Sequence, residues 1–350
     1  MGLLISLSLS GAATMAMVAT TPVATIAVGV GPVDVAVNAA THHAYVTNAY
    51  SDTVSVIDTR RIVVVATIGV GSGPVAVAVD PATHRAYVAN QASASVSVLD
   101  TCRNAIIATI PAGARPTGVA VDPTTHRAYV ANTGSNSVSV LDSGRSPRAL
   151  ATITVGRSPA AVGVNPAIHR AYVANYDSNS ISVLDIRSNA VVATIGVGAE
   201  PVSVAVDPTD HRAYVANFDS ASVSVIDTDR NAVVATIRVG SGPDSIAVNL
   251  ATHRAYATIQ GANSLSVIDT NRNAVVAAIT VGTEPDGVAV EPALHHAYVM
   301  DTPSGAVSVI DTGRDADLYN RRRAHRHEYR HDHTAAPPAR LSPAAKTRRL

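Results

Sequence analysis

The chain of 350 residues is 47% hydrophobic but only 3% aromatic, with no Trp and one Phe, so a core must be built from Val, Ala and Ile, which favours strands. Its single cysteine, Cys102, excludes an intrachain disulfide. The formal net charge is zero, but the charges are unevenly distributed. The tail, residues 313–350, has ten Lys and Arg against four acids, whereas the body has 16 Lys and Arg against 22 acids. The negative charge of the body disfavours nucleic-acid binding by that part of the chain.

Residues 1–21 form an apolar leader. Its stretch 3–19, "LLISLSLSGAATMAMVA", is similar to the hydrophobic region of a secretory signal, although no Lys or Arg precedes it. A frayed terminus or a misplaced start codon is the alternative. The stretch is short and contains several Ser and Thr, so it is a poor membrane span. We expect an export signal, and therefore a secreted, periplasmic or cell-surface protein.

Residues 22–312 repeat one unit seven times. A proline opens each unit, at Pro32, Pro74, Pro116, Pro159, Pro201, Pro243 and Pro285. Within the unit that starts at Pro74, the runs "VAVAV", "RAYVAN", "SVSVLD" and "AIIATI" each have the length of a strand and are bounded by turn residues. Four strands in 42 or 43 residues, repeated seven times, predict an all-β fold: a seven-bladed β-propeller with four antiparallel strands per blade.

The seventh unit lacks its fourth strand, because the sequence becomes polar after Asp311. A matching strand stands at the beginning, at residues 23–28. We expect this N-terminal strand to complete the last blade, which closes the ring and removes both open sheet edges. The tail that follows, residues 313–350, is rich in Arg, His and Pro and is predicted to be disordered.

The repeat carries a family resemblance. "AYVTN" at 44–48 and "AYVAN" in the next four units, followed by "SVSVID" and "ATI-x-VG", resemble the YVTN-repeat β-propeller family over about residues 22–312. The resemblance implies a propeller of the kind found in extracytoplasmic and cell-surface proteins. Two units depart from the motif: the sixth has Ile259 and the seventh Asp301 where Asn is expected.

Most polar residues of the unit recur in every blade and are therefore interpreted as structural. Each unit places a histidine in the turn between its first and second strands, at His42, His84, His126, His169, His211, His253 and His295. A catalytic base or a metal ligand is needed once, not seven times. The repeated Asn and the Asp of "VID" are interpreted as turn formers for the same reason.

The charges of the body are more informative. Assigning loops to the two faces of a propeller places the three arginines Arg115, Arg157 and Arg238 on one face together with nine acids, Asp34, Asp52, Asp177, Glu200, Asp219, Asp244, Glu284, Asp286 and Asp301. Six of these acids belong to the neighbouring blades six, seven and one. Those beside the opening prolines, namely Asp34, Asp244, Glu284 and Asp286, are expected to rim the central channel.

Carboxylates that converge there suit a divalent cation such as Ca²⁺ or Mg²⁺, with Asp34, Asp244 and Asp286 as ligands, or a cationic partner. The alternative is that the acids only aid solubility. Three aromatic residues in loops of the same face, Tyr50, Tyr176 and Phe218, are either contacts for a partner or covers for the loops beneath them.

The leading interpretation is a non-enzymatic, monomeric scaffold that binds a protein or glycan partner through its acidic face and channel mouth, without a cofactor. A second is a metal-dependent enzyme, similar to propeller hydrolases and lyases such as lactonases, with its site at the channel mouth. A third is nucleic-acid binding through the basic tail. Fold alone does not decide among them.

Overall fold

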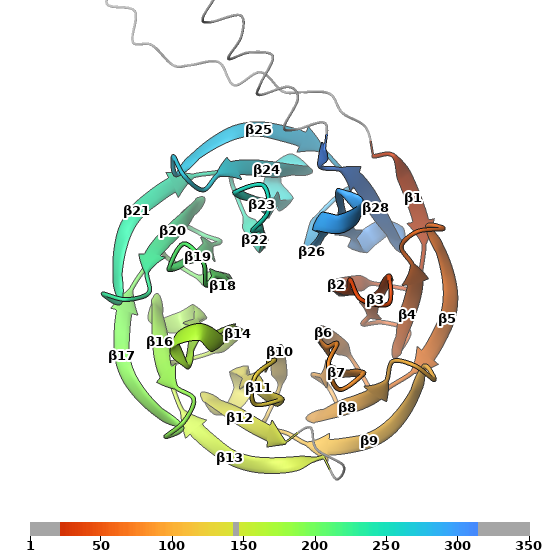
Figure 1. Ribbon diagram of the computed structural model, residues 1–350, viewed down its shortest axis with the longest axis horizontal. Helices are drawn as coiled ribbons and strands as arrows, with labels where there is room; N and C mark the ends of the chain where they lie inside the picture. Colours follow the sequence, from red (N-terminus) through yellow and green to blue (C-terminus); the bar gives the residue numbers. More distant parts are fainter. Residues whose placement is uncertain (1–21, 143–146, 314–350) are drawn as a thin grey trace, which may run out of the picture. The chain divides into compact units, whose positions relative to one another are not determined.

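The computed structural model describes residues 22–142 and 147–313, and in this part of the chain almost every segment is a β-strand or a tight turn. Seven antiparallel four-stranded sheets stand radially as the blades of a ring (Figure 1). The predicted seven-bladed β-propeller is confirmed. The leader and the basic tail lie outside the described residues.

The blades follow one another in chain order, each running from the innermost strand to the outermost. Blade one contains β2 (Pro32–Asn38), β3 (His43–Asn48), β4 (Thr53–Asp58) and β5 (Val63–Gly69). Blade two contains β6 (Pro74–Asp80), β7 (Arg85–Asn90), β8 (Ser95–Asp100) and β9 (Ala105–Pro111). Blade three contains β10 (Pro116–Asp122), β11 (Arg127–Asn132), β12 (Ser137–Asp142) and β13 (Arg148–Thr154). Blade four contains β14 (Pro159–Asn165), β15 (Arg170–Asn175), β16 (Ser180–Asp185) and β17 (Ala190–Gly196).

The remaining blades have the same order. Blade five contains β18 (Pro201–Asp207), β19 (Arg212–Asn217), β20 (Ser222–Asp227) and β21 (Ala232–Arg238). Blade six contains β22 (Pro243–Asn249), β23 (Arg254–Ile259), β24 (Ser264–Asp269) and β25 (Ala274–Thr280). Blade seven contains β26 (Pro285–Glu291), β27 (His296–Asp301), β28 (Ala306–Asp311) and β1 (Ala24–Ala27). Within residues 22–142 and 147–313, six one-turn 3-10 helices lie in loops, at Thr133–Ser135, Pro166–Ile168, Tyr176–Ser178, Gln260–Ala262, Pro292–Leu294 and Thr302–Ser304.

The N-terminal strand closes the ring as the sequence predicts. β1 pairs antiparallel with β28, with Ala24 opposite Val309 and Ala27 opposite Ala306. Backbone hydrogen bonds from Val23 to the Val309 carbonyl (2.8 Å) and from Val28 to the Gly305 carbonyl (3.0 Å) extend this pairing by one residue at each end. The first and last strands of the propeller are therefore held in one sheet.

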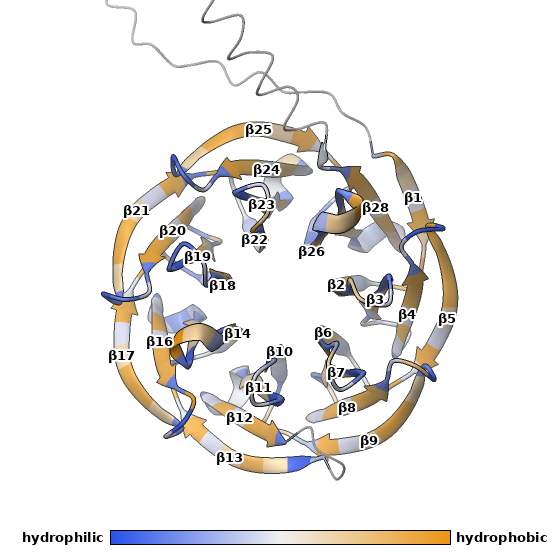
Figure 2. Cartoon of the chain, viewed as in Figure 1, coloured by the Kyte–Doolittle hydropathy of each residue, from blue (hydrophilic) through white to orange (hydrophobic). Residues whose placement is uncertain are grey.

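The core lies between the blades, and each of its apolar clusters joins two neighbours. Figure 2 shows the apolar strands and the polar loops that join them. Each blade contributes one tyrosine, at Tyr45, Tyr87, Tyr129, Tyr172, Tyr214, Tyr256 and Tyr298, and all seven side chains are fully buried. The hydroxyl groups of Tyr45 and Tyr172 donate to the carbonyls of Thr101 and Thr228 in the next blade (both 3.3 Å), so these two tyrosines add polar links to the apolar contact between blades.

The repeated histidines and asparagines have structural roles. All seven turn histidines have φ between 50° and 55°, a left-handed conformation that His tolerates better than most residues. The asparagines are fully buried rather than exposed in turns: Asn217, for example, donates to the Oγ atoms of Ser222 (3.3 Å) and Ser224 (3.0 Å). The structural interpretation is confirmed, but the asparagines donate mainly to Ser or Thr hydroxyl groups of the next strand, and Asn132 also accepts from the backbone N–H of Gly113 (3.1 Å). Among the described residues, no helix is long and apolar enough to cross a bilayer.

Candidate functional site

The innermost strands of blades six and seven differ from the others where they begin. In blades one to five the pairing register shifts between the opening proline and the residue two positions later, as between Pro32 and Asp34. In blades six and seven the shift is longer, from Pro243 to Ile246 and from Pro285 to Val288. Bulges of this kind bend a strand and redirect its side chains.

The acids sit at these irregular starts. Asp244 and Asp286 directly follow the opening prolines of blades six and seven, and Asp34 stands two positions after the opening proline of blade one; these three blades are consecutive around the closed ring. The corresponding residues of blades two to five, such as Val75, Thr117 and Ala160, are uncharged. The three carboxyl groups therefore make one sector of the ring acidic.

A cavity of about 300 Å³ lies where the innermost strands of all seven blades meet. Asp34 and Asp244 line it, beside small hydroxyl residues such as Ser203 and Ser245. The rest of its wall is apolar or backbone: Val33, Val75, Ala76, Val77, Gly118, Val119, Ala160, Ala161, Val162, Val202, Val204, Ile246, Gly287 and Val288, with Thr117. The two carboxylates thus face a small central cavity that the innermost strands enclose.

Asp34 links two blades. Its Oδ1 accepts from the backbone N–H of Val35 (2.8 Å), and its Oδ2 accepts from the backbone N–H of Val77 in blade two (2.9 Å). Ser203 and Ser245 make the equivalent bridge with a hydroxyl, to the N–H groups of Ile246 and Val288. Burial raises the pKa of Asp34 to about 6, and the two N–H bonds limit that rise.

Asp244 has no hydrogen-bond partner among the described residues, although it is partly buried. Burial, with repulsion from Asp286 and Asp34, raises its pKa to about 7. Asp286 is held from both sides: its Oδ1 accepts from Gln260 Nε2 (2.6 Å) and its Oδ2 accepts from the Thr302 hydroxyl. Burial also raises the pKa of Asp286. Asp244 is therefore the carboxyl group of the three that is open to a ligand.

Gln260 and Thr302 had not been recognised from the sequence. Each follows directly after the residue that replaces the repeated Asn, Ile259 in blade six and Asp301 in blade seven. Thr302 Oγ1 also lies 2.5 Å from the carbonyl oxygen of Pro32, so its single proton is shared between this carbonyl and Asp286, and Thr302 joins blade seven to blade one beside the site. The available signal was the departure of these two blades from the repeat.

The other predicted acids lie apart from the cavity. Asp301 is 2% exposed and accepts from the Ser308 hydroxyl (2.6 Å), so it replaces the Asn inside its blade, and burial raises its pKa. Asp52 has a left-handed backbone, and its Oδ1 accepts from the N–H of Gly73 (2.8 Å). Glu284 is exposed, also with a left-handed backbone. Among the described residues, no group of three or more His, Cys, Asp or Glu is arranged to hold a metal ion.

The three loop aromatics lie in blades one, four and five and cover backbone. The Tyr50 side chain is exposed, with a ring so close to Gly31 that a Cβ there would lie 2.4 Å from a ring carbon. A hydrogen bond to the Glu200 carboxylate raises the pKa of Tyr176 to about 12. The Phe218 ring lies over Gly242. Tyr176 and Phe218 therefore lie in equivalent loops of neighbouring blades, whereas Tyr50 lies in blade one.

Comparisons with known proteins agree with the architecture. A sequence model described as YNCE-like beta-propeller matches residues 53–240, more than half of the chain. Hydrazine synthase of Kuenenia stuttgartiensis is similar in structure, with a TM-score of 0.74 and 23% identity over 81% of this chain and 96% of that one. The β-propeller domain of Cps50 (Swd1) from Myceliophteria thermophila has a TM-score of 0.70 and 12% identity over 83% and 99%. At these identities the likeness shows the fold alone. No curated protein sequence matches the chain.

Proposed function

Because the chain belongs to the YNCE-like β-propeller family, whose fold is a ring of blades around a central cavity, we propose that it is a non-enzymatic scaffold that binds a cationic group of a protein partner at the channel mouth. The observation that carries this proposal is the unpartnered carboxyl group of Asp244 beside Asp34 and Asp286. The proposed location, secreted or at the cell envelope, depends on residues 3–19, which lie outside the described part.

Electrostatics supports a cationic ligand. Carboxyl groups with raised pKa values are unstable as neighbouring anions, and a Lys or Arg side chain of a partner would relieve that repulsion. By linkage, binding of a cation lowers the pKa of Asp244, so affinity increases with pH through about 7.

The repeat supports a scaffold in preference to a catalyst. Its histidines, asparagines and tyrosines are engaged in turns and in contacts between blades. These roles recur around the ring and are explained by the fold.

Calorimetry with the blocked tripeptide Gly-Lys-Gly as the probe tests the proposal, with blocked Gly-Glu-Gly as the anionic counterpart. We expect the chain to bind the lysine peptide and Asp244→Asn to weaken it at least tenfold at pH 8, since a hydrogen bond to a charged group is worth about 1.5–3 kcal/mol. The matched control is Asp219→Asn, which removes an exposed acid from a loop of blade five. No binding by the parent chain, or equal losses in both variants, would contradict the proposal.

A further inference from the structure

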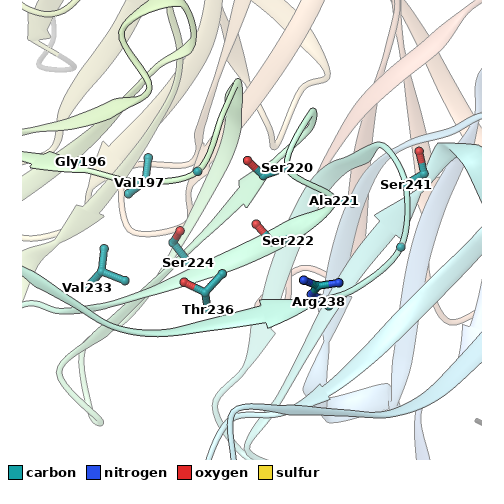
Figure 3. A pocket seen from close by; sticks show the side chains of 12 residues that line it. Gly196, Val197, Ser220, Ala221, Ser222, Ser224, Val233, Thr236, Arg238 and Ser241 are labelled. Carbon is teal, nitrogen blue, oxygen red and sulfur yellow. The ribbon is translucent and has the colours of Figure 1, made fainter. Parts of the chain in front are cut away.

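A second, larger cavity lies away from the central channel, between blades four and five. It is an open groove of about 710 Å³, within the size range of small-molecule sites. Blade four contributes the link after β17, Gly196 to Gly198, and blade five contributes β20, β21 and the loops at their ends. Figure 3 shows the side chains of Ser222, Ser224, Thr236 and Arg238 along β20 and β21.

Register explains why these side chains line one groove. Ser222 pairs with Arg238, and Ser224 pairs with Thr236, so the four residues share one face of the blade-five sheet. The residues between them, such as Val223 and Ile237, point to the opposite face and pack toward blade six. The groove is thus the polar face of β20 and β21.

Arg238 distinguishes this groove from its repeats. The outermost strands of the other blades end at Gly69, Pro111, Thr154, Gly196 and Thr280, or, in blade seven, at Ala27. In the part of the chain that the structure describes, the Arg238 guanidinium makes no ion pair or hydrogen bond, and no carboxylate lines the groove. A charged, planar donor of this kind recognises carboxylate or phosphate groups with two parallel hydrogen bonds.

The hydroxyl groups of the groove also have protons available. Ser220 Oγ accepts from the N–H of Ala199 (2.6 Å), and the Oγ atoms of Ser222 and Ser224 accept from Asn217. In blades one to three the hydroxyls equivalent to Ser220 and Ser222 bond to each other, at 2.9–3.0 Å. Within the described residues blade five has no such bond. Ser222 and Ser224 are buried, whereas Ser220, Thr236 and Ser241 are exposed, so these three hydroxyl groups can donate to a ligand.

We propose that this groove is a binding site for an acidic saccharide. The saccharide carboxylate binds Arg238, the saccharide hydroxyl groups accept from Ser220, Thr236 and Ser241, and Val197 and Val233 pack against its apolar C–H faces. Backbone shape leaves room for the sugar, because a Cβ added at Gly196 would meet no atom within 4 Å. The site is separate from the channel mouth and does not depend on the function proposed there.

Calorimetry with trigalacturonate, and with neutral maltotriose as the counterpart, tests the inference. Arg238→Thr removes the guanidinium and installs the residue that ends the outermost strands of blades three and six, so the fold should tolerate it. We expect it to weaken trigalacturonate at least tenfold, while Arg157→Ala, which removes an exposed charge outside the groove, changes affinity less than twofold. Maltotriose should bind at least tenfold more weakly than trigalacturonate.

Two further variants locate the site. Gly196→Thr, again a residue that the repeat tolerates at this position, places a side chain in the open groove and should weaken trigalacturonate at least tenfold even if Arg238→Thr proves poorly folded. Asp244→Asn should leave trigalacturonate binding unchanged. No binding of trigalacturonate by the parent chain, equal affinity for maltotriose, or full affinity in a folded Arg238→Thr or Gly196→Thr variant would overturn the inference.

Discussion

Removing the charge of Asp244 should stabilise the protein, and only at high pH. The pKa of this carboxyl group is about 7 in the folded chain against an ordinary value of 3.8. A raised pKa means that the folded state holds its proton more tightly than the unfolded state does, so stability declines as pH increases from about 4 to about 7. Asp244→Asn keeps the shape of the side chain and removes that decline.

The pKa values bound the effect. A rise from 3.8 to about 7 corresponds to at most about 4 kcal/mol of unfolding free energy. Because the side chain is only partly buried, solvent screening reduces this, and we expect about 2 kcal/mol. Urea denaturation at pH 4 and pH 8 measures it: the midpoint of Asp244→Asn should match the parent at pH 4 and exceed it at pH 8. Asp219→Asn is the control, and an equal gain at both pH values would refute the reasoning.

Three other predictions concern the repeat and the channel mouth. Gly198→Ala should destabilise the protein by about 2 kcal/mol, because the added Cβ would lie 2.7 Å from the Cγ of Asn217. Gly196→Ala adds its Cβ in open space and should cost less than about 1 kcal/mol. Thermal unfolding of the two variants measures this difference. Tyr45→Phe removes the hydroxyl bond to Thr101 and should lower the unfolding free energy by about 1 kcal/mol in urea titrations. Ca²⁺ at millimolar concentration should leave the melting temperature unchanged, since the described acids form no group arranged to hold a metal. An increase of several degrees that Asp244→Asn abolishes would instead establish a divalent-cation site at the channel mouth.

The fold was predictable because its signals repeat. A single run such as "VAVAV" is ambiguous alone, but seven copies of four such runs at one spacing leave few architectures. The missing fourth strand after Asp311 and the extra strand at the N-terminus together also predicted the closure. Repetition explained the turn histidines in the same way.

The detail of the site was less predictable. The sequence places Asp34, Asp244 and Asp286 beside the opening prolines, but it does not by itself predict the longer register shifts with which blades six and seven begin. Asp301 occupies a position that is fully buried in other blades. This burial depends on which face of the strand the side chain takes. Arg238 was counted only as a charge on the acidic face, because the groove around it forms between two blades.

The pairing of β1 with β28 also constrains the order in which the protein is made and folded. Every other blade consists of strands that leave the ribosome within about forty residues of one another, whereas Ala24 must wait for Val309. Bringing such distant segments together costs on the order of 5 kcal/mol of chain entropy, so closure is expected as the final folding step. Until then the nascent ring has two open edges, and two incomplete chains in one polysome can exchange their N-terminal strands, which favours domain-swapped dimers under rapid synthesis.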